Sequence, residues 1–424
     1  MKNISIILFF AVFLFSCAKD SCTTKYTYVK YEPVYKSTTE IRHAISMGAP
    51  EALVNPGKIY MFRSYLLVNE QFKGIHFIDN SNPSQPVRVG FLKIVGNLDM
   101  AVKGNVLYAD NYIDLVSIDL SLPMQPQLVD RDMNVFPNYG TDDAGNILVA
   151  YVEKEVTEDV LCSQVGSGWG APINQGGPFL AMSSQGAASM STGSQGRSDA
   201  SVGVGGSMAR FTINGDYLYT VDQTNLHSFD ISNTLNPTET SNVNVSWSAI
   251  ETIFPYQDKL FIGGNAGMFI FSVSNPSQPV QLSEFQHANA CDPVFVEGNR
   301  AYVTLRSGNS CQNFTNQLDV VDISDINNPT LLVSHPMSNP HGLSIKNQKL
   351  YLCDGDAGLK IFDSSDDFQI ANRLLFQDAS YSTYDVIASP FQDLLLVVGK
   401  DGLTQYDIQN PSQAVKLSTI PVQR

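Results

Sequence analysis

Short apolar runs that end in an acidic residue and a proline-containing turn recur along most of the chain. In the clearest copy, a mostly apolar run from Gly74 ends at Asp79 and is followed by Pro83 and Pro86. A repeat of about 40 to 45 residues built from such runs is typical of a four-stranded propeller blade. The corresponding anchors lie 40, 111, 42, 50, 41 and 44 residues apart, at Asp79, Asp119, Asp230, Ser272, Asp322, Asp363 and Asp407.

A second pattern precedes each anchor, in which two apolar runs flank a polar turn. Gly104, Gly215 and Gly298 occupy three of these turns, where glycine supplies the positive φ of a tight hairpin. Each unit therefore predicts an inner strand, a hairpin to a second strand, a third strand and an outer strand. The expected fold is all-β, a β-propeller of four-stranded antiparallel blades.

The 111-residue interval contains an insertion of unusual composition at 163–207, with 11 Gly and 10 Ser among 45 residues. Such a stretch has too few apolar residues to order itself, so the sequence predicts a flexible insertion. Without it, one repeat and a remnant at 146–156 are left. Seven blades are expected, or eight if the remnant forms an incomplete blade of its own.

The third-strand motif resembles the LVIVD repeat of bacterial propeller proteins, over roughly residues 51–424. The opening segment, from Tyr26 to His76, is similar to uncharacterised Bacteroidetes lipoproteins of that type. Some copies depart from the motif: Ser272 replaces the aspartate, Ala414 replaces a proline, and the copy ending at Asp363 lacks the proline pair. The resemblance implies a propeller and little about function, because propellers host several enzyme classes and pure scaffolds.

The N-terminus carries an apolar run from Ile4 to Phe15, too short to span a bilayer as a helix. Cys17 follows at the point where polarity begins, and this junction resembles a lipobox. We therefore expect a lipoprotein signal peptide at 1–16, a lipidated tether and N-terminal strand at 17–50, and the propeller at 51–424. The alternative is an ordinary signal peptide with a chance cysteine. The lipid would place the protein at the outer membrane of the cell envelope, with surface and periplasmic display both open.

The remaining cysteines are odd in number, so at least one free thiol is expected in an oxidising compartment. Cys291 and Cys311 flank two predicted strands of one hairpin and are the best disulfide candidates. The histidines show no zinc-binding spacing. With 26 Lys and Arg against 41 Asp and Glu, the net charge of -15 also disfavours nucleic acid.

The starts of the inner strands hold the best candidate binding site, because that end of each strand points into the central channel. Polar and aromatic residues are concentrated there although only 16% of all residues are charged. A funnel lined by these side chains would suit a cation, a sugar or a cationic peptide. In the alternative reading, each acid caps its own loop. The candidates are Asp99, Trp247, Glu251, His287, Asp292, His341, Tyr381 and Asp385.

Two further groups of acids have structural readings. Asp354 and Asp356 resemble the start of a calcium loop, but the equivalent turns of other repeats lack the paired carboxylates. The aspartates that end the third strands are expected to accept hydrogen bonds from the turn that follows. No cofactor is predicted.

Three functions from different classes remain open at this stage. The first is a lipid-anchored binding or scaffold propeller with a protein or carbohydrate ligand. The second is a propeller enzyme acting on carbohydrate or peptide, for which no nucleophile with its base is visible. The third is a structural subunit of an outer-membrane complex.

Overall fold

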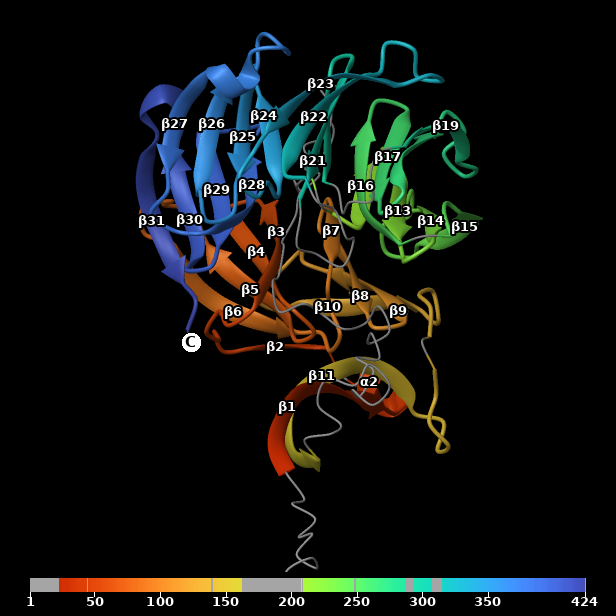
Figure 1. The fold of residues 1–424 in the computed structure, drawn as a ribbon. Coiled ribbons are helices and arrows are strands. Elements are labelled where there is room, and N and C mark those ends of the chain that lie inside the picture. The colour runs from red at the N-terminus through yellow and green to blue at the C-terminus, as the bar shows by residue number, and fades with distance from the viewer. Residues whose placement is uncertain are drawn as a thin grey trace, which may run out of the picture. The chain divides into compact units, whose positions relative to one another are not determined.

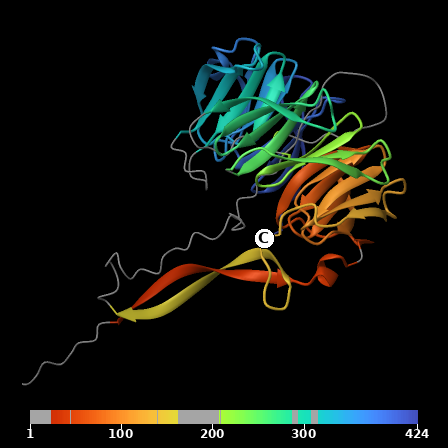
Figure 2. The same ribbon diagram turned by 90° about the vertical axis from the view of Figure 1, so that its right-hand side faces the viewer.

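The computed structural model describes residues 23–43, 45–138, 140–161, 207, 209–247, 249–286, 293–306 and 315–423. They fall into two compact units, one within 1–36 and 141–184, the other within 37–140 and 185–424. In the first unit, β1 (Thr23–Lys36) pairs with β11 (Ile147–Leu161) as a two-stranded antiparallel ribbon (Figure 2). Most of the 146–156 remnant therefore lies in this ribbon and not in a blade.

The second unit is a propeller of seven blades (Figure 1), and the eight-blade alternative is wrong. Each blade is an antiparallel sheet whose four strands follow one another in the chain. The first four blades are β3 (Pro56–Phe62), β4 (Tyr65–Glu70), β5 (Gly74–Asp79) and β6 (Val87–Lys93); β7 (Met100–Lys103), β8 (Val106–Asn111), β9 (Asp114–Asp119) and β10 (Gln127–Asp132); β12 (Phe211–Asn214), β13 (Tyr217–Val221), β14 (Asn225–Asp230) and β15 (Thr238–Asn244); and β16 (Ile250–Tyr256), β17 (Lys259–Gly264), β18 (Gly267–Ser272) and β19 (Val280–Gln286).

The last three blades have the same order of strands. They are β20 (Val294–Glu297), β21 (Arg300–Leu305), β22 (Gln317–Asp322) and β23 (Thr330–Pro336); β24 (Leu343–Lys346), β25 (Lys349–Cys353), β26 (Leu359–Asp363) and β27 (Leu374–Asp378); and β28 (Thr383–Ala388), β29 (Leu394–Gly399), β30 (Gly402–Asp407) and β31 (Val415–Pro421). A short β2 (Ser46–Gly48) pairs with β6 as a fifth strand of blade 1. The described helices are short: α2 (Thr38–Ile41), η1 (Ile370–Asn372) and η2 (Pro411–Gln413).

Local sequence explains these boundaries. Gly104 and Gly215 adopt positive φ, at 60° and 62°, in the hairpins between the first and second strands. The aspartates that end the third strands accept hydrogen bonds from the amide two residues later, which confirms the predicted turns. In blade 1, for example, the Ser81 amide lies 2.9 Å from the Asp79 carboxylate.

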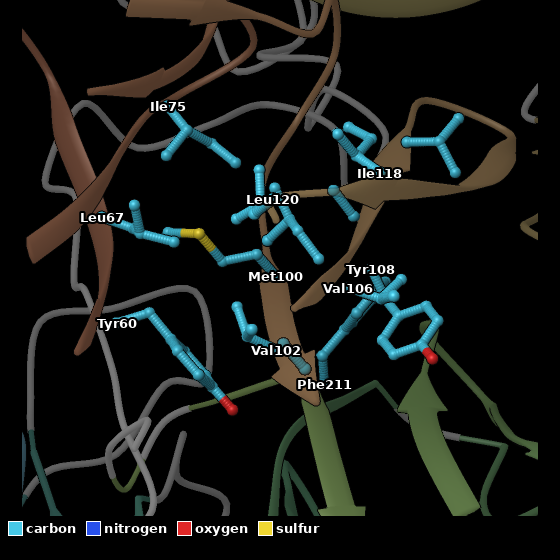
Figure 3. Close-up of a cluster of buried hydrophobic side chains, with 14 of the residues drawn as sticks. Tyr60, Leu67, Ile75, Met100, Val102, Val106, Tyr108, Ile118, Leu120 and Phe211 are labelled. Carbon is cyan, nitrogen blue, oxygen red and sulfur yellow. The ribbon is translucent and has the colours of Figure 1, made fainter. Parts of the chain in front are cut away.

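Apolar side chains pack between neighbouring blades. Figure 3 shows Tyr60, Leu67 and Ile75 of blade 1 facing Met100 and Val102 of blade 2 in one such cluster. Because each blade is built from consecutive strands, packing and a few hydrogen bonds close the ring between blades 7 and 1. Leu53 forms a parallel bridge with Val422, and its carbonyl accepts a 2.7 Å bond from the Gln423 amide.

The inner strands begin at one end of the propeller, which also carries the turns between second and third strands. We call this end the entry face. The opposite end carries the hairpins between first and second strands and the proline corners, and we call it the hairpin face. Among the described residues, no helix has the length and apolar character needed to cross a membrane.

Candidate binding site in the central channel

Four blades place a charged residue at the same position relative to the inner strand, directly before the residue that pairs with the fourth residue of the second strand. Strand register establishes the equivalence. In each of these blades the next residue is apolar and pairs with the same position of the second strand. The inner strand is the edge of its sheet, so this position faces the channel. The four residues are Lys58, Asp99, Arg210 and Asp385.

These side chains interact electrostatically across the channel together with three others. We call the set the channel ring. Its charges alternate in sign from blade 1 to blade 5, blade 6 contributes a histidine, and blade 7 contributes an acid. The ring consists of Lys58, Asp99, Arg210, Glu251, Arg306, His341 and Asp385.

The basic members change the expected character of the site. Lys58, Arg210 and Arg306 were absent from the candidates chosen from the sequence, which were acids, histidines and aromatics. Burial lowers the pKa of Lys58, and the carboxylates of Asp99 and Asp385 oppose that effect. Within the described residues the channel is therefore close to charge balance and is not a funnel of acids.

Asp99 is an inter-blade cap. Its carboxylate accepts hydrogen bonds from the backbone amides of Met100 at 2.7 Å and Arg210 at 2.5 Å, so it joins blade 2 to blade 3. Burial raises its pKa, while Lys58 and the two amides oppose the rise. Below it, Asp110 accepts the amides of Leu98 and Asp99, and burial raises the pKa of Asp110 to about 7. The carboxylate of Asp99 therefore caps backbone amides, as in the alternative reading of the sequence.

Asp385 lies in a different environment. Asp385 lies in β28, two residues after the strand begins at Thr383, and its side chain is fully buried. Within the described part of the chain, neither carboxylate oxygen has a hydrogen-bond partner. Burial raises the pKa of Asp385 well above its usual range, against the influence of the Val386 amide and of Lys58. The Val386 amide favours the charged form but does not form a hydrogen bond of standard geometry. A buried polar group without a partner is costly, which makes Asp385 a candidate ligand-binding residue.

His341 is held in its neutral form. Its Nδ1 lies 2.8 Å from an Arg306 guanidinium nitrogen, which can only donate, so Nδ1 is the acceptor. Burial and the Arg306 charge lower the pKa of His341 to about 3. An imidazole in this environment is a poor proton donor near neutral pH.

The segment that leads into blade 3 also enters this region. Ser207 is fully buried, and its Oγ accepts a 3.1 Å hydrogen bond from the Leu343 amide at the start of the blade 6 inner strand. Two residues later, the Ala209 carbonyl accepts the Ile253 amide of blade 4. Ser207 belongs to the glycine- and serine-rich stretch by composition, yet it lies in the core of the propeller.

Two of the described candidates, Trp247 and Tyr381, lie elsewhere. Trp247 is 95% exposed, in the loop before blade 4. Tyr381 packs away from the channel, with its hydroxyl 3.0 Å from that of Tyr406 on β30. Five residues lie outside the described residues: Cys17, His287, Cys291, Asp292 and Cys311.

The suspected calcium turn is a structural cap. The Asp354 carboxylate accepts the amides of Ser338 and Asn339 and lies 2.6 Å from Lys360 Nζ. Asp356 is exposed and bonds to Ser382. No group of three or more metal-ligating side chains is found among the described residues.

Asp354 belongs to a recurring device that the sequence analysis missed. In blade 1, Glu70 likewise accepts two amides of the preceding loop, those of Val54 and Asn55, and pairs with His76 at 3.0 Å. An acid near the end of the second strand thus caps the loop that leads into its own blade. A carboxylate at or near the end of the second strand was the available signal in several blades, as at Glu70, Asp110, Asp222 and Asp354.

Comparison with known proteins agrees with this architecture. Residues 205–245 and 289–335 match the LVIVD repeat. LVIVD repeats are present in this chain. The matched residues cover blades 3 and 5. No match to a curated protein is significant.

Of the similar solved structures, the one with a TM-score of 0.50 supports the fold and nothing further. The crystal structure of the computationally designed Ika8 protein has a TM-score of 0.50 at 10% identity, covering 87% of this chain and 89% of that one. A functionally unknown protein from Desulfotomaculum acetoxidans has a TM-score of 0.49 at 12% identity, covering 86% and 97%.

Proposed function

We propose that this protein is a lipid-anchored binding propeller of the cell envelope, of the Bacteroidetes lipoprotein type, with its ligand at the channel ring. The observation that carries the proposal is the buried Asp385 carboxylate, whose two oxygens have no partner among the described residues. Folding alone gives no reason to retain such a group, since an apolar residue would avoid the desolvation cost.

A second polar group indicates the nature of the ligand. Arg210 Nε is buried in the same ring and also has no partner within the described residues. A ligand that offers a donor to Asp385 and an acceptor to Arg210 would satisfy both groups. The near balance of charge around the channel favours a dipolar or polyhydroxyl ligand over a bare divalent cation.

The ligand site is tested by thermal-shift screening of the full chain with amino acids, oligosaccharides, amines and divalent metals. A ligand that binds only the folded protein stabilises it by about 2.7 kcal/mol at one hundred times its Kd. We expect hits among dipolar or hydroxylated compounds and their loss in Asp385→Asn. Asp356→Asn is the matched control, because it removes an exposed acid on the same face. A silent screen, or hits that survive Asp385→Asn, would contradict the proposal.

The anchor is tested separately. Cys17→Ser should release the protein from membranes, because one lipid-modified cysteine is the attachment that the sequence indicates. Cys22→Ser, five residues later, is the matched control and should leave the protein bound. Membrane association that persists in Cys17→Ser would refute the anchor without bearing on the channel.

A further inference from the structure

A second hollow lies on the hairpin face, between blades 5 and 6, far along each strand from the channel ring. Its volume is about 570 Å³. It is lined by the hairpins of the two blades and by the turns that follow their third strands, and every lining residue except Gly298 has a polar side chain. We call it the hairpin-face pocket. Such a lining suits a hydrogen-bonding ligand and disfavours an apolar one.

Comparison of the blades explains why the pocket opens at this place. In four blades, the last residue of the inner strand forms a hydrogen bond with the hairpin of the next blade. Glu297 holds the same position in blade 5, but its side chain forms no hydrogen bond or ion pair within the described residues. The four bonds join Lys103 to Asp216 at 2.5 Å, Asn214 to Gln257 at 2.7 Å, Tyr256 to Gly298 at 2.9 Å, and Lys346 to Gln392 at 2.8 Å.

The unpaired carboxylate has an energetic consequence. Burial raises the pKa of Glu297, so its charged form is poorly solvated, and no cationic side chain of the described residues pairs with it. The one arginine of the pocket, Arg300, is already engaged, at 2.6 Å from Asp367 and 3.1 Å from Asp322. A cationic group on a ligand would supply the missing partner.

A hydroxyl of the pocket is also unsatisfied. Ser364 is 6% exposed, and its Oγ has no hydrogen-bond partner within the described part of the chain. Ser364 lines the pocket together with the amides of Asn299 and Gln348. These groups can donate to and accept from the hydroxyls of a sugar ring.

We propose that the hairpin-face pocket binds an amino sugar, with its ammonium group against Glu297 and its ring hydroxyls against Ser364 and the neighbouring amides. The site is separate from the channel ring, because it lies at the opposite ends of the strands. Its occupancy does not depend on a ligand at Asp385.

The test is isothermal titration of the full chain with glucosamine and with glucose. Glucosamine should bind about ten times more tightly, since a charge-assisted hydrogen bond is roughly twice as strong as a neutral one. Glu297→Gln should remove that preference and Ser364→Ala should weaken the binding of both sugars severalfold. Lys103→Gln, at the equivalent position of blade 2, should bind as the wild type does.

Three results would overturn the assignment of an amino sugar to the hairpin-face pocket. Failure of glucosamine to bind at millimolar concentration would overturn the proposal, and so would equal affinity of wild type and Glu297→Gln. Loss of binding in Asp385→Asn would assign the sugar to the channel ring and overturn the assignment to the pocket. Because Ser364→Ala leaves all charges unchanged, its effect distinguishes a specific site from general attraction to an acidic protein.

Discussion

The carboxylate of Asp385 occupies the space beside Gly342 that a side chain would otherwise fill. A Cβ on Gly342 would collide with Asp385 Oδ1 and lie 3.0 Å from its Cα. The Gly342 amide donates to the Tyr384 carbonyl at 3.0 Å, so the two inner strands approach at this point. Blades 6 and 7 can therefore bring a buried acid into the channel only because residue 342 is glycine.

This contact predicts a strong effect of Gly342→Ala. Inserting a methyl group should cost about 1–3 kcal/mol of unfolding free energy, as overpacking does elsewhere. Urea denaturation should show that Gly342→Ala with Asp385→Ala costs less than the sum of the single changes. Gly48→Ala is the control, because its Cβ would make only ordinary contacts. Additive effects would mean that the two residues do not share the same space.

The raised pKa of Asp385 predicts a pH-dependent stability. A carboxyl group that is more easily protonated in the folded state contributes stability below its unfolded pKa of about 3.9, and that contribution is lost as pH rises through the folded value. Asp385→Asn should therefore gain stability relative to wild type as pH increases above 4. The measurement is unfolding free energy from pH 4 to 8, without ligand. Parallel curves for the two proteins would contradict the assignment.

His341 should behave as a neutral imidazole throughout the physiological range. Its pKa of about 3 means that its ring signals in NMR should not change between pH 5 and 8. Because folding disfavours its protonated form, this residue should cost stability as pH falls below about 6.5. Arg306→Gln should raise the pKa, whereas Arg63→Gln should not. A His341 titration near pH 6.5 in the wild type would show that the Arg306 contact is not maintained.

Replacing Asp354 and replacing Asp356 should have very different effects on the unfolding free energy, although the two residues are close in sequence. Asp354→Asn breaks a buried ion pair with Lys360 and should cost about 3–5 kcal/mol. Asp356→Asn changes an exposed side chain and should cost less than about 0.5 kcal/mol. Calcium should not raise the Tm of the wild type. A calcium-dependent Tm that requires both acids would restore the metal-site interpretation.

The fold was predictable because each repeat carries its own local signals. The aspartate at the end of a third strand and the glycine of a hairpin act within a few residues, so Asp79 and Gly104 have the predicted roles. The composition of the channel was only half predictable, because the acids stand out in a sequence of low charge whereas single basic residues do not. Lys58 and Arg210 occupy the same repeat position as Asp99, directly before an apolar residue, and aligning the repeats without regard to charge would have found them.

Other features had no local signal. Ser207 belongs to a stretch of glycine and serine with no periodic pattern, so its contact with Leu343 depends on tertiary structure alone. The aromatic residues beside the inner strands could not be assigned a direction, and the structure turns Trp247 to solvent and Tyr381 toward Tyr406. Exposure of a loop side chain is decided by packing between blades, which the repeat does not encode.

The central claim is that the channel ring binds a ligand through Asp385. The most direct measurement is a high-resolution experimental density map of the protein purified from its native membranes without added compounds. We expect non-protein density larger than water within hydrogen-bond distance of the Asp385 carboxylate and directed toward Arg210. Density from ordered water alone, or a protein side chain that satisfies both Asp385 oxygens, would contradict it.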